Sequence, residues 1–246
     1  MDAPGEPLVL VPGLNNSTRL WNGLIAALPR SIAPHPVECP ALDDVDAVAA
    51  ALLSRLPPWF WLCGFSFGGY VALAMLARAP ERVKGLALVA TTARADSERQ
   101  KEARRASIAR AAAGEYEALT ASQARFVFHP DNLDRSDLQD LRRAMAREYG
   151  AERFMAHLAA CIARPDRSDL VAASHIPVLV AAGEADQVVP TERQRQMAES
   201  IPGACFVAVS GAGHMLPVER PADLAHALAA WMAMPAAAGV PAEAGR

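Results

Sequence analysis

The most informative stretch of this chain is WLCGFSFGGY, residues 61–70. It joins an apolar run to a G-x-S-x-G pattern, and an alanine-rich, helix-like segment follows at residues 68–79. A serine between glycines at a sharp turn from strand to helix is typical of a nucleophile elbow, in which strained backbone lifts the hydroxyl into the open. A Cβ at Gly64 or Gly68 would collide with neighbouring backbone at such a turn. The stretch therefore predicts that Ser66 is a nucleophile.

On both sides of this stretch, short apolar runs alternate with helix-like segments. Uninterrupted apolar runs are typical of strands buried on both faces, and their alternation with helices is typical of a doubly wound α/β fold. The apolar runs are residues 8–11, 59–63, 83–90, 177–182 and 206–209, and the helix-like segments lie near 19–28, 44–56, 68–79, 191–200 and 222–232. We expect a mainly parallel sheet of about six strands, with ligands bound beyond the carboxyl ends of the strands.

The alternation stops between residues 94 and 173, where charged, helix-like sequence contains no convincing strand. Its position between two sheet strands predicts a helical cap that shapes a pocket and excludes water. A solvated helical decoration is the alternative. We therefore assign residues 1–93 and 174–234 to an α/β core, residues 94–173 to a helical cap, and the Ala/Gly/Pro-rich residues 235–246 to a flexible tail.

Two loops later in the chain supply an acid and a base. A serine hydroxyl is a poor nucleophile at neutral pH, so it needs an imidazole within reach and a carboxylate that orients the imidazole. Asp186 lies just past the apolar run at 177–182 and is predicted to be that acid, with Glu184 as the competing choice. His214 ends a small-residue loop after the last apolar run and is predicted to be the general base. The chain order serine, acid, histidine supports both assignments.

Acyl transfer also needs hydrogen-bond donors for a developing oxyanion. The backbone N–H of Phe67, directly after the nucleophile, is one candidate. After the first apolar run, Gly13 allows a turn that presents the backbone N–H of Leu14. We therefore expect Leu14 and Phe67 to form the oxyanion hole through their backbones.

Together these residues resemble the α/β-hydrolase fold superfamily. The motifs that carry the resemblance are residues 64–69, 183–186, 213–214 and 219–221, which read GFSFGG, GEAD, GH and ERP. The chain is similar to small capped members: carboxylesterases, enol-lactonases, carbon–carbon bond hydrolases and the esterase that demethylates pimeloyl-carrier-protein esters. The resemblance implies a catalytic triad of Ser66, Asp186 and His214. Serine at position 66 excludes superfamily members that need an aspartate or a cysteine there.

The chain departs from the superfamily in two places. Most members carry His-Gly in the first oxyanion turn, whereas this chain has Pro12-Gly13. The first buried strand begins within ten residues of Met1, so we expect the two leading strands of the family to be absent.

Large apolar residues near the predicted site are candidates for the walls of an acyl pocket, although each of them could equally be packed in the core. Two cap arginines could bind a substrate carboxylate through a bidentate contact, or could simply be solvated or paired on helix faces. The wall candidates are Trp21, Phe65, Phe126, Phe128, His129 and Met215, and the arginines are Arg125 and Arg164.

The composition narrows the function further. A formal net charge of -3, with scattered basic residues, gives no electrostatic footprint for nucleic acid. The four cysteines lack CxxC spacing, so we expect neither a disulfide framework nor a metal site. No signal or membrane segment is evident, which predicts a cytoplasmic protein without a membrane partner.

The sequence thus predicts a cofactor-free serine hydrolase that cleaves a small-molecule ester through an acyl-enzyme. One alternative is a C–C bond or enol-lactone hydrolase of a carboxylate-bearing substrate. The other alternative is a non-catalytic, ligand-binding member of the fold. The sequence leaves the oligomeric state open.

Overall fold

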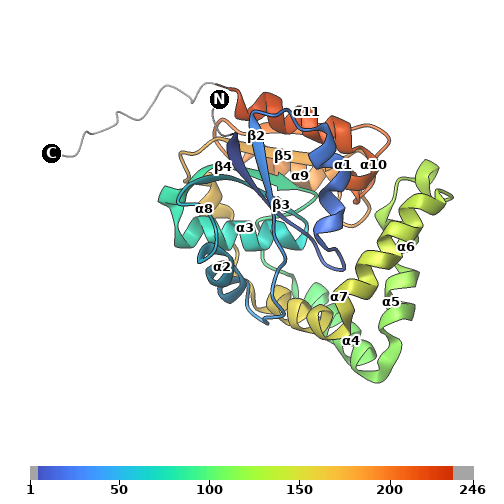
Figure 1. Ribbon diagram of the computed structural model, residues 1–246. Helices are drawn as coiled ribbons and strands as arrows, with labels where there is room; N and C mark the ends of the chain where they lie inside the picture. The colour runs from blue at the N-terminus through green and yellow to red at the C-terminus, as the bar shows by residue number, and fades with distance from the viewer. Residues whose placement is uncertain (1–4, 235–246) are drawn as a thin grey trace.

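A computed structural model describes residues 5–234, which form one parallel sheet covered by helices on both faces (Figure 1). The spatial order of the strands is β2-β1-β3-β4-β5-β6. Their bounds are β1 Glu6–Val11, β2 Ile32–Pro36, β3 Phe60–Phe65, β4 Val83–Val89, β5 Val178–Gly183 and β6 Cys205–Val209. The fold is therefore the α/β architecture of six strands that the sequence predicts. The predicted tail, residues 235–246, lies outside the described residues.

The helices form a layer on each face of the sheet. One layer contains α1 (Asn22–Ala27), α10 (Leu216–Glu219) and α11 (Pro221–Met232), and the other contains α2 (Val45–Leu53), α3 (Phe67–Arg78) and α9 (Thr191–Glu199). Side chains alternate between the two layers along each strand. In β1, for example, Val9 and Val11 belong to the core cluster under α3, whereas Leu8 and Leu10 belong to the cluster under α11. Apolar side chains on both faces explain why the strands appear as unbroken apolar runs.

Strand β2 is the one strand that the apolar runs do not indicate. It pairs with β1 alone and lies at the edge of the sheet. Its sequence, Ile-Ala-Pro-His-Pro, contains two prolines, and its last two residues are exposed. Proline lacks the N–H that an inner strand needs on both sides, so it is confined to edge strands.

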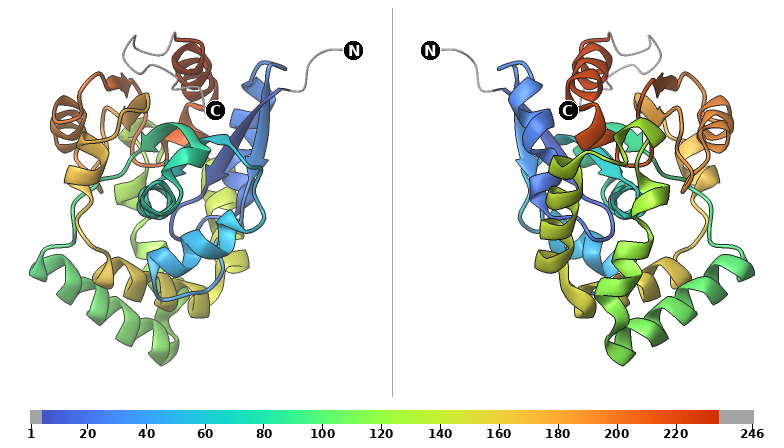
Figure 2. Two further views of the ribbon diagram at one scale, coloured as in Figure 1. Left: turned by 90° about the vertical axis from the view of Figure 1, so that its left-hand side faces the viewer. Right: turned by 90° about the vertical axis from the view of Figure 1, so that its right-hand side faces the viewer.

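The region between β4 and β5, all of it described, consists of helices joined by loops and contains no strand. It contains α4 (Glu98–Arg110), α5 (Tyr116–Ser122), α6 (Ala124–Val127), α7 (Ser136–Ala163) and α8 (Ser168–Ala172), with a bend at Gly150 inside α7. Helices α4 to α7 gather on one side of the sheet, while α8 returns to the core through Val171 (Figures 1 and 2). Short helical turns lie at Thr18–Trp21, Pro80–Arg82, Ala111–Glu115 and Pro130–Asn132.

None of the helices within residues 5–234 combines the length and hydropathy that a membrane crossing requires.

Replacing Gly68 tests how tightly α3 packs against β1. A Cβ at this position would overlap the carbonyl oxygen of Val11. We expect Gly68→Ala to lower the free energy of unfolding by about 3 kcal/mol, because backbone must move to make room. Gly114→Ala is the control, since its Cβ meets open space and its positive φ alone costs about 1–2 kcal/mol. Equal losses in urea unfolding of the two variants would contradict this packing.

Candidate active site

The candidate site lies where the strand order reverses. The chain passes from β1 outward to β2 and then returns across the sheet to β3, so the loops after β1 and β3 diverge. Such a switch point opens a crevice at the carboxyl ends of the strands. Ser66 follows β3, Asp186 follows β5 and His214 follows β6. All three predicted side chains therefore start from the same edge of the sheet.

Ser66 occupies the strained backbone conformation that the sequence predicts. Its φ is 51° and its ψ is -115°, in a region that side chains rarely adopt. Hydrogen bonds hold the residue there: its N–H donates to Val89 O at 2.9 Å, and its carbonyl accepts from Thr91 Oγ1 at 2.7 Å and from Gly69 N at 2.9 Å. Ser66 is thus presented at the start of α3 by a rigid turn.

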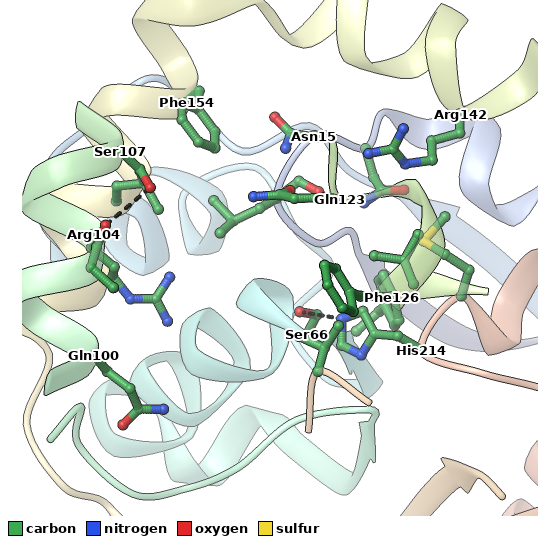
Figure 3. A pocket seen from close by; sticks show the side chains of 18 residues that line it. Asn15, Ser66, Gln100, Arg104, Ser107, Gln123, Phe126, Arg142, Phe154 and His214 are labelled. Atoms are coloured by element: carbon green, nitrogen blue, oxygen red, sulfur yellow. Dashed lines mark hydrogen bonds between the residues drawn. The ribbon is translucent and has the colours of Figure 1, made fainter. Parts of the chain in front are cut away.

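The three side chains form a continuous hydrogen-bonded chain. His214 Nε2 lies 3.0 Å from Ser66 Oγ (Figure 3). On the other side of the ring, His214 Nδ1 lies 2.9 Å from Asp186 Oδ2. A carboxylate only accepts hydrogen bonds, so the imidazole carries its proton on Nδ1 and leaves Nε2 free to accept from the serine hydroxyl. A serine held in this way can lose its proton to the imidazole as it attacks a carbonyl carbon.

Asp186 is held firmly in place. Its side chain is fully buried, and Oδ1 accepts from the backbone N–H groups of Val188 and Val189, both at 2.9 Å. Oδ2 accepts from Gln194 Nε2 at 3.1 Å as well as from His214. The competing acid, Glu184, is exposed and accepts from Gly211 N at 3.3 Å. The structure therefore brings Asp186, and not Glu184, to the histidine.

The two predicted oxyanion donors lie beside the serine. Phe67 is the first residue of α3, where a helix leaves N–H groups without an internal partner. A Cβ at Gly13 would lie 3.1 Å from Ser66 Cβ, so the turn after β1 packs against the serine. Within residues 5–234, no hydrogen bond occupies the backbone N–H of Leu14 or of Phe67. Both donors remain available for a ligand.

A cavity of about 370 Å³ opens in front of Ser66 and His214 (Figure 3). Its walls come from the loops that follow strands β1, β3, β5 and β6 and from helices α4, α6 and α7. The lining residues are Leu14, Asn15, Asn16, Phe65, Ser66, Gln100, Ala103, Arg104, Ser107, Gln123, Phe126, Val127, Arg142, Phe154, Leu158, Val188, His214 and Met215.

The structure places only half of the predicted wall residues on this cavity. Phe65, Phe126 and Met215 line it. Trp21 does not, because it is buried in the core, edge-to-face with Phe65. Phe128 is also fully buried in the core.

His129 is drawn into a different contact. Its Nδ1 accepts from Asp131 N at 3.1 Å, and the residue is absent from the cavity wall.

The arginines on the cavity are not the two that the sequence suggests. Arg125 is exposed and lies over the Phe126 ring. Arg164 is buried away from the cavity, where it pairs with Asp96 at 2.9 Å. Arg104 on α4 and Arg142 on α7 line the cavity instead.

A helical spacing could have indicated one wall. Gln100, Ala103, Arg104 and Ser107 recur at the i, i+3, i+4, i+7 positions of α4 and all face the cavity. Because this face of α4 is mainly polar, the spacing of apolar residues does not indicate it.

Glu219 on α10 links the His214 loop to residues 129–132 through hydrogen bonds. Its buried carboxylate accepts from Gly213 N at 2.8 Å, from His129 N at 2.7 Å and from Asn132 Nδ2 at 2.8 Å. A further backbone bond joins Met215 N to the cap at Val127 O, at 2.9 Å. The sequence motif ERP contains Glu219, but its position alone does not show this role.

His157 packs against Phe67, the residue that follows Ser66. Its ring stacks on Phe67 with centroids 4.4 Å apart. Nε2 donates to Pro40 O at 2.7 Å, which leaves Nδ1 to accept from the Tyr149 hydroxyl. Burial lowers the pKa of His157 to about 4, so the ring is neutral in the folded protein at neutral pH.

Among the residues that the structure describes, no three His, Cys, Asp or Glu side chains gather as a metal site. The four cysteines are all free thiols.

Comparison with known proteins gives a consistent result. The family described as alpha/beta hydrolase fold matches residues 6–221, which span all six strands and the three loops of the site. The pimeloyl-[acyl-carrier protein] methyl ester esterase of Nitrosomonas europaea is 35% identical over 96 residues, a match that covers 36% of this chain and only 38% of that protein. The esterase of the same name from Chromobacterium violaceum is 29% identical over 197 residues, covering 77% of each chain.

One of the similar solved structures is also an esterase. The thermophilic esterase from Thermogutta terrifontis, with malate bound, superimposes with a TM-score of 0.85 at 26% identity. That match covers 94% of this chain and 90% of that chain.

Glu219→Gln tests the fastening of the His214 loop. The amide replaces one acceptor oxygen by a donor, so at least one of the three N–H groups loses its partner in a buried place. We expect the free energy of unfolding to fall by about 1–3 kcal/mol. Glu184→Gln, a control in the exposed part of the neighbouring loop, should change it by less than about 0.5 kcal/mol. Equal effects in chemical denaturation would contradict the fastening.

The lowered pKa of His157 should make the free energy of unfolding depend on pH. Its pKa in the folded protein, about 4, lies below the ordinary value of 6.5, so the unfolded chain binds a proton first as pH falls. Its contribution should be complete above about pH 6.5 and should decline by up to about 3 kcal/mol as pH falls toward 4. Unfolding free energies of wild type and His157→Gln should therefore converge over this range. The exposed-site control His226→Gln should keep the wild-type profile, and parallel curves for His157→Gln would contradict the prediction.

Proposed function

Because the chain belongs to the α/β hydrolase fold family, we propose that it is a serine hydrolase that cleaves small-molecule esters. One observation carries the proposal: Ser66 Oγ, the His214 ring and the Asp186 carboxylate are joined at 3.0 and 2.9 Å, in front of an open cavity. The esterases among the similar proteins support the same reaction class.

The proposed reaction has two halves. Ser66 Oγ attacks the ester carbonyl carbon while His214 Nε2 takes the hydroxyl proton and then gives it to the departing alcohol. Water attacks the resulting acyl-enzyme in the second half, with His214 again acting as the base. Asp186 keeps the imidazole in the required tautomer and stabilises its positive charge. A buried carboxylate with four hydrogen bonds suits this role because it cannot swing away.

Charge on the tetrahedral intermediate needs its own donors. We assign this role to the backbone N–H groups of Leu14 and Phe67, which carry no other hydrogen bond among the described residues. The first turn of α3 adds the positive end of a helix dipole at the same place. Because both donors are fixed by backbone, they need no reorganisation during the reaction.

The cavity sets the scale of the substrate. At about 370 Å³ it lies at the small end of ligand pockets. Apolar side chains from the core and the cap surround Ser66, among them Phe65, Phe154, Leu158 and Met215. We therefore propose a small acyl ester as the substrate.

Three variants test the assignment. Ser66→Ala should lower kcat/KM on activated esters by about four orders of magnitude or more, and Asp186→Asn by about two to four. Glu184→Gln should stay within about threefold of wild type. Intact-mass analysis after a fluorophosphonate probe should show one adduct in wild type and none in Ser66→Ala. Undiminished hydrolysis or labelling in Ser66→Ala would overturn the proposal.

A further inference from the structure

The charges on the cavity wall are one-sided. Two of its 18 lining residues, Arg104 and Arg142, are positively charged, and none is acidic. Arginine stays protonated in proteins, so both side chains bring a full charge. The cavity is therefore electropositive as well as partly apolar.

The two arginines differ in how their charge is balanced. Arg104 pairs with Asp96 at 2.5 Å. The same carboxylate also pairs with Arg164, so this cluster holds two arginines and one acid. Asp96 accepts on both oxygens, and its single negative charge is smaller than the two positive charges of Arg104 and Arg164.

Arg142 makes no ion pair with any residue in the described part of the chain. It is buried, and one of its nitrogens, Nη2, donates to the backbone carbonyl of Thr120. Its Nε and Nη1 donate to no protein atom within residues 5–234. Burial of an unpaired charge is costly, so such a group is normally matched by an opposite charge.

The electrostatic surroundings of Arg142 agree with the missing partner. Burial lowers its pKa and Arg143 lowers it further, while only the Tyr116 hydroxyl acts in the opposite direction. No carboxylate within residues 5–234 is among these causes.

Uncharged donors stand beside this guanidinium. Figure 3 shows Arg142 projecting from α7 toward Asn15 and Gln123. Asn15 Oδ1 lies 3.0 Å from the Tyr116 hydroxyl, whose one hydrogen also faces Ala146 O at 2.7 Å, and Asn15 Nδ2 has no hydrogen-bond partner among the described residues. The side-chain amide of Gln123 likewise makes no hydrogen bond there. An anion placed at Arg142 would meet a charged fork and further amide donors.

We propose that Arg142 binds a carboxylate of the substrate. The enzyme would then be selective for esters that carry a free carboxylate in addition to the ester group. This inference rests on the proposed function, because Ser66 and Arg142 line the same cavity and must act on one molecule. The ester carbonyl lies at Ser66, and the carboxylate replaces the missing counter-ion of Arg142. A bidentate pair with a guanidinium also fixes the orientation of the substrate.

The test compares substrates that differ in one charge. In the first arm, monomethyl esters of dicarboxylic acids with four to nine carbons are compared with methyl esters of monocarboxylic acids of equal length. In the second arm the carboxylate lies in the alcohol part: acetyl esters of hydroxy acids are compared with acetyl esters of alkanols. For at least one length in either arm, wild type should show a kcat/KM about 10- to 100-fold higher for the charged ester.

Variants assign the preference to one side chain. Arg142→Met should lower kcat/KM for the charged esters about 10- to 100-fold more than for the neutral esters, and Arg142→Lys should retain part of the preference. Arg143→Met is the matched control, since Arg143 is the next residue on α7, is exposed and pairs with Asp140. It should behave as wild type. Absence of any preference in wild type, or an unchanged preference in Arg142→Met, would overturn the proposal.

Binding measurements test carboxylate recognition by Arg142 separately from ester hydrolysis at Ser66. Calorimetry with the monomethyl esters on Ser66→Ala needs no turnover, and adding Arg142→Met should weaken their affinity about 10- to 100-fold. Equal affinity in the two variants would overturn carboxylate recognition even if esters are hydrolysed. If no ester is hydrolysed but this difference appears, carboxylate binding stands and the esterase assignment fails.

Discussion

Helix α3 comes so close to the end of β1 that only a glycine fits at position 68. The turn at Gly13 packs against Ser66 beside this contact, and hydrogen bonds to Val89, Thr91 and Gly69 hold the serine at a positive φ. The serine hydroxyl and the unbonded backbone N–H groups of Leu14 and Phe67 therefore belong to two turns that pack together. The acid and the base come from loops after β5 and β6, so they depend on the register of the same sheet.

The charged groups inside the molecule fall into two kinds. The carboxylates of Asp186 and Glu219 are surrounded by hydrogen-bond donors from the protein itself. Their desolvation is offset internally, so they act as fixed parts of the scaffold. The guanidinium of Arg142 has one backbone partner and open cavity beside it. A buried cation that has unused N–H donors in the free protein is stabilised most by a ligand that accepts hydrogen bonds from them.

Five of the six strands and the three residues that form the hydrogen-bonded chain could be predicted from sequence, because unbroken apolar runs and short glycine-bounded motifs are local signals. The cavity walls could not. Trp21 and Phe128 have the apolar character of wall residues but pack in the core. Position relative to the cavity depends on how distant helices pack. Arg142 is buried on the cavity wall without an acidic partner among the described residues, whereas the neighbouring Arg143 is exposed and pairs with Asp140. Contacts between residues that are distant in the chain cannot be predicted from a short stretch of sequence.

The hydrogen bonds between residues 127–132 and the His214 loop make the two ends of the helical region between β4 and β5 unequal. A motion that lifted this end would break the bonds to Glu219 and Met215 and would drag the histidine from the serine. At the other end, α4 contains no buried residue, so moving it exposes little apolar surface. A displacement of α4 would therefore leave the hydrogen bonds among Ser66, His214 and Asp186 in place, whereas a displacement of residues 127–132 would disturb them.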